Sequence, residues 1–270
     1  MTSTRLLWRI AGLAALLSTL LFVFGFAYAV RDILYPQAAG PGQAEEAAPV
    51  DHTKEPDKLQ IVAIGDSLTK GLGDTTGEGY VGKVKRGLEK TLDKPVFLWN
   101  YGVNGIRTNE LLQYVTDPKS EIPQSLRKAD IILITIGGND LFQFSQTQKP
   151  GDATQPALNF NNVRKQMPEA QERLGKIFAA VAELNPKASI VYLGLYHPFL
   201  DYDPAREGSR LLGQWNAKAY ELANRHPNIT VVPTYDLFEK QLNQYLYSDH
   251  FHPNAEGYER MAQRVLQALQ

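Results

Sequence analysis

Four short segments, far apart in the chain, carry the residue types that acyl transfer requires. A serine hydroxyl can attack an ester carbonyl when an imidazole removes its proton, and a carboxylate can orient that imidazole. Backbone and side-chain N–H groups can stabilise the oxyanion that then forms. The segments that supply these groups are Gly65-Asp66-Ser67-Leu68, Asn100-Tyr101-Gly102-Val103-Asn104-Gly105, Gly137-Gly138-Asn139-Asp140 and Asp249-His250-Phe251-His252-Pro253. Together they predict a serine hydrolase that works through an acyl-enzyme.

Ser67, His252 and Asp249 are the predicted nucleophile, base and orienting carboxylate. Ser67 follows an apolar run and two turn residues, so its hydroxyl should be accessible, although a serine in this position can also cap a helix. Asp249 and His252 stand three residues apart, a spacing that lets the carboxylate reach Nδ1 and leaves Nε2 for the serine proton. His250 is the rival base, but a residue adjacent to Asp249 should project in a different direction. Asp249 or His250 could instead only cap the helix that follows.

Three N–H donors are predicted for the oxyanion: the backbone N–H of Ser67, the backbone N–H of Gly105 and the side-chain amide of Asn139. Gly105 follows one apolar run. Asn139 follows Gly137-Gly138 at the end of another, where two glycines let the backbone approach a ligand closely. Taken singly, each of these glycines is equally consistent with an ordinary turn.

An alternation of strands and helices must hold these segments. Five short runs are rich in Val, Ile and Leu on consecutive positions, which is typical of strands buried on both faces of a parallel sheet. Between them, apolar residues recur at intervals of three and four, the pattern of a helix with one buried face, and Pro168 would lie in the first turn of one such helix. The runs cover residues 59–64, 96–100, 130–136, 189–196 and 229–232. Their order predicts an α/β sandwich with a five-stranded, mostly parallel sheet, and the first three segments lie at the carboxyl ends of its strands.

The four segments resemble the characteristic blocks of the SGNH hydrolases, also called GDSL esterases and lipases. The resemblance runs from about residue 59 to the C-terminus and implies a flavodoxin-like three-layer α/β/α sandwich, with Ser67 as nucleophile and Gly105 and Asn139 in the oxyanion hole. The chain looks closest to membrane-associated bacterial acylhydrolases of this family. It departs from many members at His250, where a smaller residue is common. The common α/β-hydrolases are a poorer match, because their Gly-x-Ser-x-Gly motif would need glycine where this chain has Thr69.

The residues after the third segment and after the fourth apolar run could bind the substrate. Phe142, Phe144 and His197 could line an acyl pocket there, or they could pack as ordinary core and loop residues. An ester of a lipid or lysophospholipid is the first expectation, and an O-acetyl ester of a cell-surface polysaccharide is the second. A catalytically silent binding module on the same fold is the third. Such a module should have lost one of the site residues, and none is lost.

Residues 1–30 are predicted to form a membrane signal-anchor. Arg5 and Arg9 precede an uncharged run over 10–30 that is long enough to span a bilayer, and these charges favour a cytoplasmic N-terminus. A cleavable signal peptide is the alternative, because Ala27-Tyr28-Ala29 suits a signal peptidase, and a buried core helix is a third. Residues 31–57 are expected to form a flexible linker and 58–270 the catalytic domain. We therefore expect a single-pass cell-membrane protein with this domain outside, or a secreted one if the segment is cleaved.

The composition of the chain limits which partners and cofactors are possible. The formal net charge is −1 and no long basic tract is present, which argues against a nucleic-acid partner. The chain has no cysteine, so neither disulfides nor lipid attachment through cysteine are available. A metal site at Asp249, His250 and His252 is conceivable, but no fourth convergent ligand is evident. We therefore expect hydrolysis without a metal or another cofactor.

Overall fold

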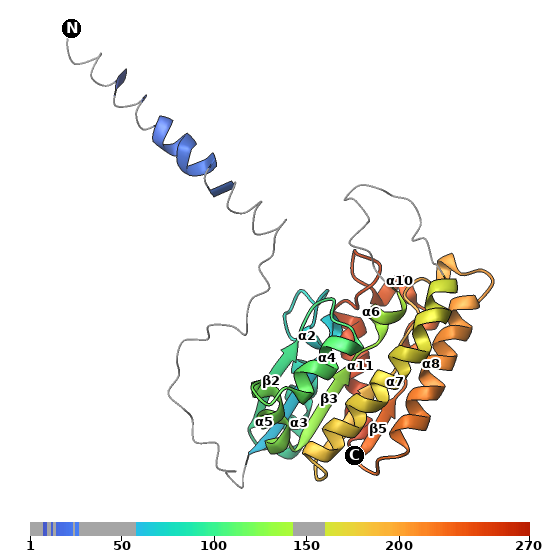
Figure 1. Cartoon of the computed structure of the whole chain (residues 1–270). Coiled ribbons are helices and arrows are strands. Elements are labelled where there is room, and N and C mark those ends of the chain that lie inside the picture. The colour runs from blue at the N-terminus through green and yellow to red at the C-terminus, as the bar shows by residue number, and fades with distance from the viewer. Residues whose placement is uncertain (1–7, 10–11, 13–14, 24, 27–57, 143–159) are drawn as a thin grey trace. The chain divides into compact units, whose positions relative to one another are not determined.

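The computed structural model describes residues 8–9, 12, 15–23, 25–26, 58–142 and 160–270. The chain divides into two units, Met1–Thr53 and Lys54–Gln270. The described residues of the first unit are helical (Figure 1). No helix within the described residues combines the length and the apolar character that crossing a membrane requires. The predicted anchor over 1–30 lies partly outside the described residues and the predicted linker over 31–57 wholly outside them, so both stay predictions.

A five-stranded sheet in the order β2-β1-β3-β4-β5 forms the centre of the second unit, and every neighbouring pair of strands is parallel (Figure 1). In this register Gly65 lies opposite both Gly102 and Thr135, so three strands end at the same level. The strands are β1 Leu59–Gly65, β2 Val96–Gly102, β3 Ile131–Thr135, β4 Ser189–Leu193 and β5 Ile229–Val232. The predicted five-stranded sheet is confirmed.

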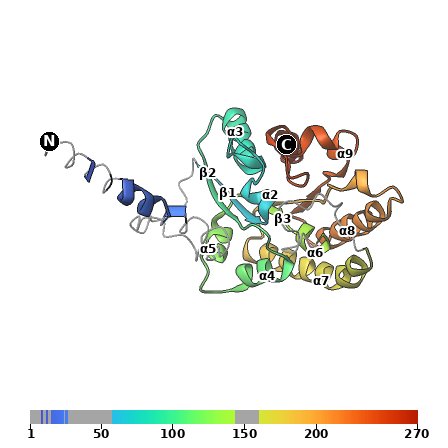
Figure 2. The same cartoon turned by 90° about the horizontal axis from the view of Figure 1, so that it is seen from above.

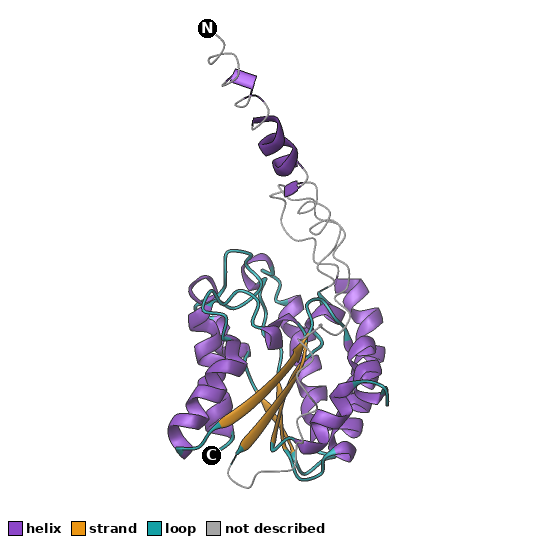
Figure 3. Cartoon of the chain, turned by 90° about the vertical axis from the view of Figure 1, so that its left-hand side faces the viewer, coloured by secondary structure: helices purple, strands orange, loops and turns teal. Residues whose placement is uncertain are grey.

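Helices cover both faces of the sheet, because its strands are apolar on both sides (Figures 2 and 3). Successive strand side chains point to opposite faces: Val62 and Ile64 belong to one hydrophobic cluster, Ile61 and Ala63 to the other, and all four are fully buried. The first cluster includes residues of α4 Thr108–Thr116, α5 Glu121–Lys128, α7 Phe160–Leu184 and α8 Glu207–Ala223. The second includes residues of α3 Gly79–Leu92 and α11 Ala255–Ala268. The unit is therefore the predicted three-layer α/β/α sandwich.

The helix α7 begins earlier than the sequence predicts. Pro168 was expected in its first turn, but the helix spans Phe160–Leu184 and holds the proline in its interior. Val163 and Met167 extend the buried stripe ahead of Pro168. Packing against the sheet therefore outweighs the backbone hydrogen bond that a proline cannot donate, and the predicted helix start was wrong.

Short helices occupy the connections after several strands. Because they are only about a turn long, they have no repeating apolar pattern that could predict them. They are α2 Ser67–Lys70, α6 Gly138–Leu141, η1 Leu200–Tyr202, α9 Tyr235–Glu239 and α10 Leu242–Tyr245. Two of them, α2 and α6, follow the neighbouring strands β1 and β3.

Candidate active site

The ends of β1, β2 and β3 bring three of the four predicted segments together. These strands are parallel neighbours that end at one level, so the residues that follow Gly65, Gly102 and Thr135 share one edge of the sheet. Helices α2 and α6 begin at this edge (Figures 1 and 2). The fourth segment precedes α11, and a hydrogen bond between His252 and Ser67 joins it to the first.

Ser67 is the first residue of α2, and its position depends on the two residues before it. Gly65 has a φ of +140°, and a Cβ there would lie 2.0 Å from the carbonyl oxygen of Thr135, so the turn requires glycine. Asp66 caps the helix by accepting a hydrogen bond from the Leu68 N–H at 3.1 Å. Because Asp66 is the cap, the Ser67 hydroxyl is left for another partner. The alternative in which the serine itself caps this helix is wrong.

A continuous chain of hydrogen bonds joins Ser67, His252 and Asp249. Nε2 of His252 lies 2.8 Å from Oγ of Ser67, and Nδ1 lies 2.6 Å from Oδ2 of Asp249. Oδ1 of Asp249 accepts the backbone N–H groups of Phe251 and His252 at 3.0 and 2.9 Å. One carboxylate therefore both shapes the loop and orients the ring, so that Nε2 faces the serine hydroxyl.

The environment of Asp249 favours its ionised form. Burial alone would raise the pKa of Asp249, but hydrogen bonds from the His252 ring and from the backbone N–H groups of Phe251 and His252 outweigh it and hold this pKa below its ordinary value. A carboxylate that keeps its charge can stabilise the imidazolium that forms when His252 takes a proton.

The loop that carries His252 is held along its backbone. The Tyr247 N–H donates to the His252 carbonyl at 2.8 Å, and the buried Tyr196 hydroxyl donates to the Phe251 carbonyl at 2.6 Å. His250, the rival base, is exposed and has a φ of +54°. The structure therefore brings His252, and not His250, into hydrogen-bond contact with the serine.

The other two predicted oxyanion donors lie in segments that contact each other. Gly105 sits between β2 and α4 with a φ of +78°, and no heavy atom comes within 4 Å of a Cβ built there. Asn139 lies in α6, and its Nδ2 donates to the Ile106 carbonyl at 2.9 Å. An amide nitrogen carries two protons, so one remains for a ligand. The second and third predicted segments are thus joined through Ile106.

A model of the GDSL-like Lipase/Acylhydrolase family matches residues 63–260, a range that includes all four segments. The chain belongs to this family. It is 34% identical over 221 residues to YpmR of Bacillus subtilis, covering 80% of this chain and 84% of that protein. It is 31% identical over 209 residues to the spore germination lipase LipC of Bacillus licheniformis, covering 77% of this chain and 94% of LipC. The solved structure of the lipase Lip_vut3 from a goat rumen metagenome matches with a TM-score of 0.65 at 28% identity, over 78% of this chain and 97% of that one.

Membership of the GDSL-like family confirms the predicted enzyme class, a carboxylic ester hydrolase. The membrane-associated subgroup, the lipid substrate and the roles of individual residues stay predictions. Within the described part of the chain, no group of three His, Cys, Asp or Glu side chains is placed to hold a metal ion.

A buried polar network beneath the predicted nucleophile of this GDSL-family enzyme is not evident in the sequence. Asp66 is buried, and the Thr135 hydroxyl donates to its Oδ1 at 2.8 Å. The hydroxyls of Thr135 and Thr69 lie 2.7 Å apart. Burial raises the pKa of Asp66 to about 6, although hydrogen bonds from Thr135 and Leu68 and the nearby His252 act in the opposite direction. The one sequence signal is the polar Thr135 at the end of an otherwise apolar strand.

A row of aromatic rings contains two of the three predicted pocket residues, Phe142 and His197. Phe142 stacks on His197 with ring centroids 5.9 Å apart and meets the edge of Phe199 at 5.8 Å. Phe199 stacks on Phe251 at 5.9 Å, and Phe251 meets the edge of His252 at 4.7 Å. The row therefore runs from the end of α6 to the predicted base.

His197 lies buried within this row, and both of its ring nitrogens have partners in the fold. Nε2 lies 3.1 Å from Oδ2 of Asp203, and Nδ1 accepts the Phe199 N–H at 3.3 Å. Burial lowers the pKa of His197 and outweighs the opposing hydrogen bond with Asp203. Both ring nitrogens of His197 therefore make contacts within the fold, and its ring stacks on Phe142. Phe144 lies outside the described residues, and the pocket roles stay predictions.

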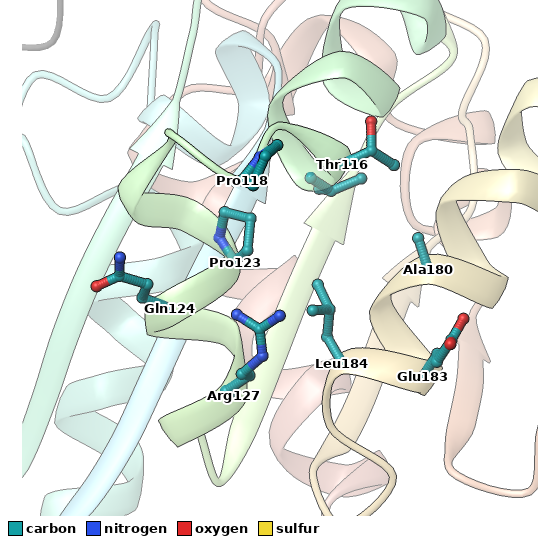
Figure 4. A pocket seen from close by; sticks show the side chains of 9 residues that line it. Thr116, Pro118, Pro123, Gln124, Arg127, Ala180, Glu183 and Leu184 are labelled. Carbon is teal, nitrogen blue, oxygen red and sulfur yellow. The ribbon is translucent and has the colours of Figure 1, made fainter.

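A surface depression of about 630 Å³ lies at the opposite edge of the sheet (Figure 4). It is formed by the end of α4, by α5 and by the end of α7. Since α5 and α7 lead into the amino ends of β3 and β4, the depression is remote from the carboxyl ends that carry the predicted site. Its lining residues are Val115, Thr116, Pro118, Pro123, Gln124, Arg127, Ala180, Glu183 and Leu184.

Proposed function

We propose that this enzyme cleaves lipid esters, with lysophospholipids and other acyl lipids as the favoured class, through a covalent acyl-enzyme on Ser67. The observation that carries the proposal is the unbroken hydrogen-bond chain from Ser67 through His252 to Asp249. In the sequence of the second unit, Ser67 lies near the start, whereas Asp249 and His252 lie near the end. The arrangement of their side chains is the one that activates a serine nucleophile.

In the first step, Nε2 of His252 takes the Ser67 proton while Oγ attacks the ester carbonyl carbon. The tetrahedral oxyanion accepts hydrogen bonds from the backbone N–H groups of Ser67 and Gly105 and from the side-chain amide of Asn139. His252 then gives its proton to the leaving alcohol, and Asp249 keeps the ring oriented. A water molecule, deprotonated by His252, next attacks the acyl-enzyme carbonyl. The bond to Oγ breaks, His252 returns the proton to Oγ, and the carboxylic acid is released with Ser67 restored.

Exposed apolar side chains accompany the site and favour a lipid ester over a polar one. Leu72, Val103 and Tyr247 are 42%, 38% and 40% exposed. Leu72 follows the helix that begins with the nucleophile, Val103 lies in the segment of the glycine donor, and Tyr247 precedes the segment of the base. Apolar surface at the mouth of a site is suited to an acyl chain. LipC, the spore germination lipase that is 31% identical to this chain, supports the same class.

The catalytic assignment is tested with a soluble ester such as p-nitrophenyl butyrate. Ser67→Ala should abolish turnover, because alanine cannot form the acyl-enzyme. His252→Ala should lower kcat by about 10⁴-fold or more, whereas His250→Ala, which removes the neighbouring imidazole, should leave it largely unchanged. A Ser67→Ala variant that keeps most of its activity would overturn the proposal. A wild-type chain that neither hydrolyses esters nor reacts with a fluorophosphonate probe would indicate a binding module instead.

The substrate class is tested with a series of esters from acetate to palmitate. We expect kcat/KM to rise with acyl length, because each additional CH₂ that becomes buried contributes about 0.8 kcal/mol. A maximum at acetate, together with release of acetate from an acetylated polysaccharide, would contradict the lipid proposal and support an O-acetyl esterase.

A further inference from the structure

Asp140 is a buried carboxylate that the proposed ester chemistry does not use. It directly follows Asn139 in α6 and is 3% exposed. Its Oδ2 accepts the backbone N–H of Thr108 at 3.0 Å, and its Oδ1 accepts the Thr108 hydroxyl at 2.7 Å. A carboxylate buried to this degree is costly unless its oxygens are satisfied. These contacts therefore constrain where α4 begins relative to α6.

Arg173 completes the cluster from a third helix, α7. Its Nη2 lies 3.3 Å from Oδ1 of Asp140, and its Nε donates to the Thr108 hydroxyl at 2.7 Å. The Thr108 hydroxyl thus donates to the carboxylate and accepts from the guanidinium. Residues of α4, α6 and α7 are joined in a closed ring of hydrogen bonds, in which Arg173 balances the charge of Asp140.

The same two helices, α4 and α6, flank the proposed oxyanion donors. Thr108 is the first residue of α4 and follows Gly105 closely in the chain. Asp140 is adjacent to Asn139, whose Nδ2 donates to the Ile106 carbonyl at 2.9 Å. Consecutive residues of α6 therefore hold the glycine segment at two points, Ile106 and Thr108.

Gly105 has no packing contact on the side where a Cβ would stand, so the contacts at these two points are important for its position. No heavy atom comes within 4 Å of a Cβ built at this residue, and its φ is +78°. A backbone N–H in such a loop can shift unless the residues beside it are tied down. The contact between Thr108 and Asp140 ties the loop on its C-terminal side.

We infer that Asp140, Thr108 and Arg173 form a positioning cluster that sets the distance between the oxyanion donors Gly105 and Asn139. This role rests on the proposed hydrolysis of esters and deepens it. The three residues act through the two donors and not on the substrate itself. Donors must be placed within a fraction of an ångström of the developing charge, and a misplacement of about 1 Å can lower a rate about 10²-fold.

The first test is Asp140→Asn, which keeps the shape of the side chain but removes its charge and one acceptor. We expect kcat for p-nitrophenyl butyrate to fall about 10- to 100-fold with KM nearly unchanged, because oxyanion donors act on the transition state more than on the bound ester. Glu169→Gln is the matched control, since Glu169 pairs with the same Arg173 from an exposed position. This control should leave kcat unchanged.

A milder pair of variants keeps the test valid if Asp140→Asn folds poorly. Thr108→Val removes the hydroxyl at nearly constant volume and should lower kcat about tenfold, whereas Thr108→Ser keeps the hydroxyl and should retain most activity. Thr116→Val lies at the other end of α4, where the hydroxyl bonds to carbonyls of its own helix. It should leave kcat unchanged. Thermal unfolding of each variant separates stability from activity.

A double-mutant cycle with Asn139→Ala decides whether Asp140 acts through the oxyanion donors. If it does, Asp140→Asn should lower kcat by a much smaller factor in the Asn139→Ala background than in the wild type. An equal loss of kcat in both backgrounds, or a rise in KM in place of the fall in kcat, would overturn the positioning role. An inactive wild type or an active Ser67→Ala variant would instead refute the proposed function, so the two failures are distinguishable.

Discussion

The carboxyl group of Asp66 is buried directly beside Ser67, in surroundings that favour its protonated form. Burial raises its pKa from 3.8 to about 6, even though its Oδ1 accepts hydrogen bonds from the Leu68 N–H and the Thr135 hydroxyl. Between these two pH values the folded state holds a proton that the unfolded state has lost. The stability that this proton provides is complete below the unfolded pKa and is lost as the pH rises through about 6.

Asp66→Asn should remove this pH dependence. Asparagine keeps an Oδ1 that can accept the same two hydrogen bonds, but it cannot ionise. The variant should be more stable than the wild type above about pH 6, by on the order of 3 kcal/mol, and the difference should shrink toward pH 4. Thermal unfolding of both chains across this range measures the difference, with the exposed Asp93→Asn as a control for the substitution itself. A variant that is less stable than the wild type at every pH would contradict this account.

The residues proposed to carry the chemistry could be predicted because each lies in a short segment of specific residue types. Asp249 and His252 are close in sequence, and the structure brings their side chains to 2.6 Å. The partners of Asp140 could not be predicted in this way. Arg173 belongs to a long helix and Thr108 begins another, and they meet only once both helices pack. A contact between residues that are far apart in sequence cannot be predicted from a local sequence pattern.

Between α2 and α3, a glycine-rich loop supports the segment that carries the base. Gly73 in this loop has a φ of +96°, and a Cβ there would lie 2.5 Å from the Pro253 carbonyl oxygen and 3.0 Å from Cβ of His252. The Tyr258 hydroxyl of α11 donates to the neighbouring Leu72 carbonyl at 2.7 Å. The loop and the base segment are therefore in direct contact, and the loop limits where the imidazole can lie.

Gly73→Ala should displace His252 from Ser67 and lower kcat about 10²-fold, because the new methyl group cannot be placed without moving the base segment. Gly77→Ala is the matched control in the same loop. Its φ is +76°, but nothing lies within 4 Å of a Cβ built there, so it imposes similar backbone strain without the clash. Steady-state kinetics and thermal unfolding of both variants provide the comparison. The same kcat in the two variants would show that this contact does not position the base.

The strands could be predicted as elements, but the short helices could not. Burial on both faces of the sheet demands an unbroken apolar run, and the run predicted at 59–64 became β1, Leu59–Gly65. The helix α6 depends instead on tertiary contact. A Cβ at its cap, Gly137, would lie 2.2 Å from the Trp215 ring, so this turn requires glycine because a side chain of α8 packs against it. The sequence around α6 does not show that a side chain from another helix will pack against this turn.

The second unit contains every part of the proposed site that the structure describes. Its hydrophobic clusters cover both faces of the sheet, and the bond between Ser67 and His252 joins positions 185 residues apart. A bond across this sequence distance forms only when the whole sandwich is assembled. The proposed catalytic residues and the core that places them therefore belong to one folding unit, which should fold and act without the first.

Residues 58–270 expressed alone should hydrolyse p-nitrophenyl butyrate with the kcat/KM of the full chain.

We also propose that residues 1–30 hold the enzyme at a membrane with the catalytic unit outside, since the sequence over 10–30 is uncharged and side chains there such as Leu21 and Phe22 are exposed. The full chain should then sediment with phospholipid vesicles and the truncated chain should not, and only hydrolysis of a vesicle-embedded ester should fall on truncation. A full chain that stays in the supernatant, or a mature chain that begins after Ala29, would instead favour a cleaved signal peptide and a secreted enzyme. Loss of soluble-ester activity on truncation would show that the first unit contributes to the fold or the site.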